Sequence, residues 1–106
     1  MVISHEVILA GSTPSLEIGK SLTQQGFSQL YDGKPEAAFK AWQAAYRAYE
    51  QLNNEQGMNS SLINQSLALQ ALGSYTTACQ VLTRYRLLML YQYYRLSLRQ
   101  NIYGYH

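Results

Sequence analysis

The feature that most constrains this 106-residue chain is a spacing of residues that occurs twice, 40 positions apart. A glycine is followed by a small residue five positions on, a large residue nine positions on, and a further packing position at the twelfth. The two copies are Gly33, Ala38, Trp42 and Ala45, then Gly73, Ala78, Leu82 and Tyr85. Self-similarity at a period of this size is typical of one supersecondary unit that is repeated along the chain. The spacing therefore predicts a short helical repeat.

Each part of this spacing has a physical role in a helical hairpin. The two glycines suit tight turns, because a residue without Cβ adopts a positive φ at little cost. The small and large residues that follow lie one helical turn apart on one face. Another small residue precedes each glycine by seven positions, where we expect a second helix to cross closely. The predicted core signature is Gly26, Gly33, Ala38, Trp42, Ala45, Ser66, Gly73, Ala78 and Leu82.

Prolines and turn residues divide the chain into four expected helices and leave a tail. Pro14 and Pro35 suit the first turns of the first two helices, and a third helix is expected over residues 55–72. The fourth is expected to begin at Tyr75 and to run past residue 82. Short loops indicate antiparallel neighbours. The predicted fold is all-α, with a leader over residues 1–12, two antiparallel helix-turn-helix repeats over 13–83, and a C-terminal capping or appended helix over 84–106.

This pattern resembles the tetratricopeptide repeat, a pair of antiparallel helices with small residues at the crossing. Gln25 and Gln65 depart from it, since that family has a large residue there, and the period exceeds the usual length of about 34 residues. The stretch from Gly57 to Tyr75, followed by Ala78 and Cys79, is similar to the repeat region of bacterial CHAT-domain proteins. In those proteins such repeats precede a caspase-like peptidase domain.

The resemblance implies a scaffold and not an enzyme. The related peptidase domain needs a histidine–cysteine pair on an α/β fold, for which this chain has no room. His5 and His106 stand at opposite ends of the chain, and Ser60 and Ser61 have no histidine near them in sequence to act as a base. The glycines also do not form a phosphate-binding loop, because no strand is expected before them and no lysine–hydroxyl pair follows them. We therefore predict no catalytic residues, no metal site and no cofactor.

In tetratricopeptide repeats the first helix of each pair lines a groove that takes a peptide or a partner's surface. By position, the resemblance implies groove residues in the first and third helices: Thr23, Phe27, Leu30, Tyr31, Ile63, Asn64, Leu67 and Gln70. Asn64 could hold a peptide backbone, since its amide both donates and accepts. The alternative is that Asn64 is a solvated amide and that Phe27 and Leu67 pack against a neighbour, because repeats rarely bury their faces alone.

Charge is distributed unevenly along the chain. All six acidic residues fall within the first 55 positions, whereas the tail carries Arg84, Arg86, Arg95 and Arg99 and no acidic residue. The net charge of +2 is too small to predict a nucleic-acid partner. Three interpretations of the tail stay open: a helix that caps the fourth helix, a basic aromatic helix that touches a membrane or a partner, and a sequence introduced by truncation or a shifted reading frame.

Two repeats are few for a stable solenoid, so another protomer, a further domain or the tail is expected to cover the fourth helix. A homo-oligomer is therefore one expectation. The single cysteine, Cys79, excludes an internal disulfide, and its place beside Ala78 predicts a buried side chain. The apolar run in residues 7–10 is too short for a signal peptide, which favours a cytoplasmic location. The resembling proteins are often exported, which leaves an exported or membrane-associated location open.

Overall fold

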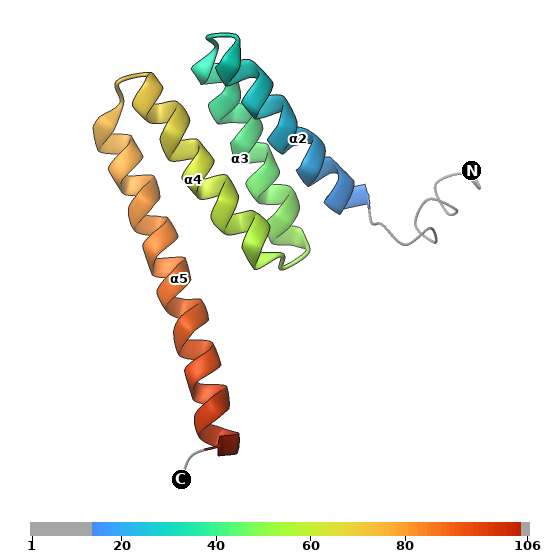
Figure 1. Cartoon of the computed structure of the whole chain (residues 1–106), viewed down its shortest axis with the longest axis vertical. Coiled ribbons are helices and arrows are strands. Elements are labelled where there is room, and N and C mark those ends of the chain that lie inside the picture. The colour runs from blue at the N-terminus through green and yellow to red at the C-terminus, as the bar shows by residue number, and fades with distance from the viewer. Residues whose placement is uncertain (1–13, 105–106) are drawn as a thin grey trace, which may run out of the picture.

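The computed structural model describes residues 14–104, which form four α-helices without a strand in that range. The helices are α2 (Pro14–Tyr31), α3 (Pro35–Gln51), α4 (Glu55–Ala71) and α5 (Tyr75–Gly104). Consecutive helices run in opposite directions and pack on one another (Figure 1). The predicted all-α fold, with two helical hairpins and a C-terminal helix, is confirmed. The predicted leader over residues 1–12 lies outside the described residues, and so do His5 within it and His106 at the other end of the chain.

The three turns between the helices share one backbone motif. Their central residues, Gly33, Asn53 and Gly73, have positive φ angles of 77°, 54° and 76°. At the first turn, the amide of Gly33 donates to Leu30 O at 3.0 Å, and that of Lys34 donates to Gln29 O at 2.8 Å. The same pair of bonds closes the other two turns, and it satisfies carbonyls at the helix end. The two glycines were predicted on this ground, and the asparagine supplies the third such position.

Two aromatic rings of α3 fill slots that glycines open in its neighbours. Trp42 is completely buried, and a Cβ at Gly26 of α2 would overlap its indole. A Cβ at Gly19 of α2 would come within 2.9 Å of the Tyr49 ring. A Cβ at Gly57 of α4 would overlap the same ring, so both glycines make room for it. The pairs Gly19 with Tyr49 and Gly26 with Trp42 are seven residues apart on each helix, which fixes the antiparallel register of α2 and α3.

The core follows the helix-to-helix contacts as two small clusters. The first contains Ala38, Trp42 and Ala68, against which Leu30 and Phe39 pack. The second joins α4 to α5. Its buried members are Leu62, Leu69, Ala78 and Val81.

Two expected core positions on α5 are exposed, and their assignment to the core is wrong. Leu82 is 38% exposed, although Trp42 at the equivalent place in the first hairpin is fully buried. Cys79 is also exposed, which corrects its predicted burial. The physical reason is the number of neighbours. Helix α3 lies between α2 and α4, whereas α5 packs mainly on α4 and touches α3 at Arg84, which lies over the Tyr46 ring.

The predicted C-terminal helix is continuous with the fourth helix, and together they form α5. The helix continues without a break from Tyr75 to Gly104, so residues 84–104 are appended to the fourth helix and do not fold back over it. Arg95 of α5 pairs with Glu55 in the first turn of α4, at 2.6 Å. Beyond Arg95 the helix extends past the end of α4 and protrudes from the bundle (Figure 1).

Candidate functional site

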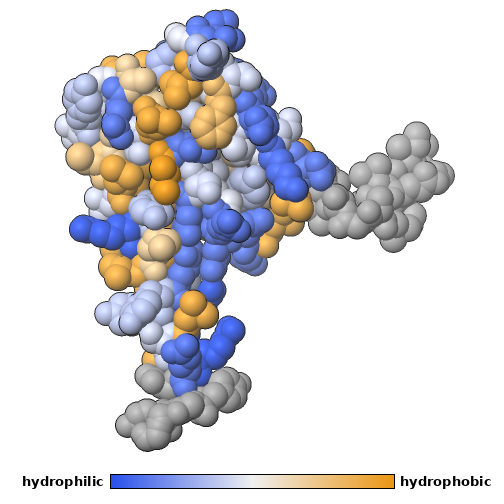
Figure 2. Space-filling model, in the orientation of Figure 1, coloured by the Kyte–Doolittle hydropathy of each residue, from blue (hydrophilic) through white to orange (hydrophobic). Residues whose placement is uncertain are grey.

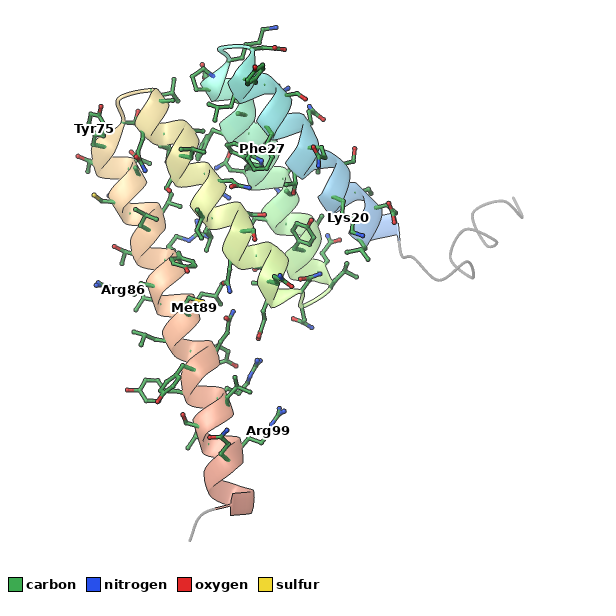
Figure 3. All side chains as sticks on the ribbon, viewed as in Figure 1. Lys20, Phe27, Tyr75, Arg86, Met89 and Arg99 are labelled. Atoms are coloured by element: carbon green, nitrogen blue, oxygen red, sulfur yellow. The ribbon has the colours of Figure 1, made fainter. Side chains whose placement is uncertain are left out.

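The sequence-predicted groove residues come from α2 and α4, which both pack on α3 and also contact each other. Three apolar side chains on these helices are each 44% exposed: Phe27, Ile63 and Leu67. Apolar side chains gather on the face shown in Figure 2, and Phe27 lies on this face between the ribbons of α2 and α4 (Figure 3). Apolar side chains held half in solvent by neighbouring helices form a surface that another molecule can cover.

The α2 part of this surface rests on the buried tryptophan. The Phe27 ring meets the Trp42 ring edge to face, with centroids 5.0 Å apart and an interplanar angle of 70°. The indole Nε1 of Trp42 donates to the carbonyl of Thr23 at 3.1 Å, and the Thr23 hydroxyl donates to the carbonyl of Gly19 at 2.8 Å. Thr23 thus helps to position the tryptophan beneath Phe27, and its hydroxyl is used within its own helix.

Leu30 and Tyr31, the other two predicted residues on α2, differ sharply in burial. Leu30 is half-buried and packs on the cluster that contains Trp42. Tyr31 is 93% exposed at the last residue of the helix. Both line, with Phe27 and Ser28, an open depression of about 620 Å³ at this end of the surface. Tyr31 therefore forms the exposed rim of this depression, while Leu30 is its more buried part.

The α4 part of the surface presents a row of neighbouring side chains. Ile63 and Leu67 are four residues apart and share a face. Asn64 is half-exposed and Gln70 is exposed. Beneath them, the Ser66 hydroxyl donates to the carbonyl of Ile63 at 2.8 Å, which anchors this turn. Helix α4 thus presents the apolar pair and two amides, and Phe27 lies on the adjacent helix α2.

One structural residue of the site was not recognised from the sequence. Gln65 is buried, and its Nε2 donates to the carbonyl of Trp42 at 3.3 Å. This bond ties α4 to α3 at the point where the groove floor is formed. A glutamine that departs from the family pattern is a weak sign of such a role. The stronger sign is that Gln25 stands at the same place in the first copy.

The described residues offer little for other kinds of chemistry. Within residues 14–104, no three histidine, cysteine, aspartate or glutamate side chains are grouped so that they could hold a metal ion. None of the helices in that range has a stretch long and apolar enough to cross a bilayer.

No family model, curated protein or solved structure matches this chain. The relationship to tetratricopeptide repeats and to CHAT-domain proteins therefore stays a prediction from the residues quoted above.

Proposed function

We propose that this chain is a non-catalytic scaffold of tetratricopeptide type, which binds an extended peptide or a helix of a protein partner across α2 and α4. The observation that most supports this function is that adjacent helices present three half-exposed apolar side chains, Phe27, Ile63 and Leu67, the first of them on the buried ring of Trp42. A surface that is already formed before binding loses little conformational entropy on association.

The chemistry of the surface indicates what such a partner offers. Apolar side chains of the partner cover Phe27, Ile63 and Leu67, and this burial supplies most of the affinity. The amides of Asn64 and Gln70 donate to and accept from a peptide backbone. A partner with apolar residues at alternate positions of an extended segment, or along one face of a helix, fits this arrangement.

A narrower partner class follows from the resemblance to CHAT-domain proteins. In that version the repeats regulate a caspase-like peptidase that is encoded elsewhere. A neighbouring reading frame with a histidine–cysteine pair would favour it. Binding of that peptidase to the α2–α4 surface is its direct test.

The experiment is a selection from a displayed library of random peptides on the full chain, followed by affinity measurements. The double variant Ile63→Arg with Leu67→Arg places two charges on the surface, and we expect it to weaken binding of the selected peptides by about tenfold or more. Gln80→Arg, at an exposed residue of α5, is the control and leaves binding unchanged. Peptides that bind the double variant as tightly as the parent chain would exclude this surface.

A second function is favoured by the composition of α5. Residues 75–104 carry four arginines and no acidic residue, and the exposed side chains of Leu87, Tyr91 and Leu98 share one side of the helix. Such a helix suits contact with an anionic membrane surface. Salt-sensitive binding to phosphatidylserine vesicles, lost in the double variant Arg86→Glu with Arg99→Glu but kept in Arg47→Glu on α3, would establish it.

A further inference from the structure

The contact between the two hairpins is made by one face of α3 and one face of α4. On α3 the face contains the rings of Trp42 and Tyr49. On α4 it contains Gly57, which admits the Tyr49 ring, and Gln65, whose amide bonds to the carbonyl of Trp42. Ala68 completes it by packing in the tryptophan cluster. This contact defines how the second helix of one hairpin receives the first helix of the next.

Helix α2 repeats part of the α4 face, with Glu17 and Ser28 in place of Gly57 and Ala68, and no other described helix buries it. The motif Ser-Leu-x-x-Gln occurs in both helices, as Ser21, Leu22 and Gln25 in α2 and 40 positions later in α4. In α4 the serine and the glutamine are both buried, and the glutamine bonds to α3. In α2 the equivalent Ser21 and Gln25 are exposed, as is Ser28, the equivalent of Ala68.

Helix α5 carries the counterpart of the α3 face, and it is covered on one side only. Leu82 and Met89 stand 40 positions after Trp42 and Tyr49. The two residues on α3 are 0% and 8% exposed, whereas Leu82 and Met89 are 38% and 41% exposed. Met89 is held from the α4 side, where its sulfur accepts from Asn59 Nδ2 at 3.2 Å. The open side is the one that a following helix would cover.

We propose that a second copy of this chain docks its α2 on α5, in the same way that α4 packs on α3. The two unpartnered faces lie at opposite ends of the helix order and are complementary halves of a contact that the chain already makes once. A second copy is the occupant we favour, because this chain itself carries both the α2 face and the α5 face. The Ser-Leu-x-x-Gln motif of α2 occurs again in α4, where it packs on a partner helix. Because the two halves differ, each copy offers one of each, and the association is head-to-tail.

Head-to-tail stacking has consequences for the molecule as a whole. It continues the array of hairpins beyond two, which is what repeat units need in order to bury their faces. It also places α2 of the second copy beside α4 of the first, in the position that α4 has beside α2 within one chain. Unlike a two-fold symmetric dimer, a head-to-tail pair still has one free face at each end. Further copies can therefore add, and the average mass grows with protein concentration.

The test is light scattering coupled to size exclusion on the full chain over a wide range of concentration. The parent chain is expected to show an average mass that rises above the 12.0 kDa of one copy. The double variant Ser21→Arg with Gln25→Arg blocks the incoming face at two exposed residues and is expected to stay at the mass of one copy. Gln24→Arg, at another exposed residue of α2, is the matched control and is expected to associate like the parent.

A complementation step separates this arrangement from symmetric dimers. Leu82→Glu blocks the face on α5, and thermal unfolding followed by circular dichroism checks that this variant is folded. Mixed in equal amounts, the α2 variant and the α5 variant hold one intact contact between them and are expected to form a species of twice the single-copy mass. If Leu82→Glu does not fold, the difference between the Gln25 and Gln24 variants decides alone.

Three outcomes overturn the proposal. The parent chain could stay at the mass of one copy throughout, which would leave the open face of α5 to a helix from a different chain. The α2 double variant could associate like the parent, which would indicate a symmetric contact through α5 or another surface. The two folded blocked variants could fail to pair when mixed, which would show that the two faces do not meet each other.

Discussion

Helices α3 and α5 hold the same place in the two hairpins and differ in what surrounds them. Helix α3 lies between two neighbours, and its large ring at Trp42 is fully buried. Helix α5 packs mainly on one described helix, α4, and the equivalent Leu82 is more than one-third exposed. The comparison shows that the repeat spacing specifies which side of a helix is to be packed, while burial itself depends on a second helix being present.

The largest expected effect comes from removing the two equivalent side chains. Trp42→Ala leaves a cavity between α2, α3 and α4, and we expect it to lower the free energy of unfolding by about 3–5 kcal/mol. Leu82→Ala removes a partly solvated side chain and should lower it by about 1 kcal/mol. Urea denaturation of both variants at low protein concentration measures the difference. Equal losses would mean that the two helices are packed alike, contrary to the comparison.

The next effect concerns the close crossing of α2 and α3. A methyl group at Gly26 would overlap the buried indole of Trp42, so Gly26→Ala should lower the free energy of unfolding by about 1–3 kcal/mol. The sign of the change is the informative result. Alanine favours an isolated helix over glycine by about 1 kcal/mol, so a more stable variant would show that the indole does not fill this slot. Thermal unfolding of the variant beside the parent decides it.

The two equivalent glutamines are expected to respond differently to truncation. Gln65→Ala removes a buried amide that bonds to the carbonyl of Trp42, and the expected loss is about 1–2 kcal/mol. Gln25→Ala alters an exposed residue and should change the stability of a single copy by no more than about 0.5 kcal/mol. Denaturation at low concentration compares them. A loss at Gln25 as large as that at Gln65 would indicate that its amide is already packed within one copy.

The smallest expected effect is at the middle turn. Asn53 has a φ of 54°, where its Cβ is unfavourable and where the other two turns have glycine. Asn53→Gly should raise the melting temperature slightly, for a gain of about 0.5 kcal/mol or less. Gly73→Asn, the reverse exchange at an equivalent turn, should give a loss of similar size. A loss on Asn53→Gly would mean that the asparagine side chain stabilises its turn.

Much of the fold could be predicted from the sequence, because the residues that begin helices and form turns act locally. Pro14 and Pro35 begin helices as expected, and the glycines of the outer turns have the predicted positive φ. Gly26 lies at the predicted close crossing. Each of these predictions depends on the backbone conformation of a few residues or on a spacing within one hairpin.

The errors concern properties that depend on neighbours. Leu82 and Cys79 were assigned to the core because the spacing implies a packed face, but the spacing does not reveal whether a helix covers that face. Within the candidate site, the half-exposed Phe27 and Ile63 could be placed by position. The role of Gln65 could not, since it depends on which carbonyl of α3 the register brings within reach of its amide.

The measurement that tests the account most directly is native-state hydrogen exchange at two protein concentrations. At low concentration, the amides around Trp42 on α3 should exchange slowly, and those around Leu82 on α5 should exchange faster, because local opening is easier where fewer side chains are buried. At high concentration, protection should rise together in α5 and in residues 21–28 of α2, since association stabilises the faces that it covers. Equal protection of α3 and α5 at low concentration, or no rise in α2 and α5 with concentration, would contradict the account.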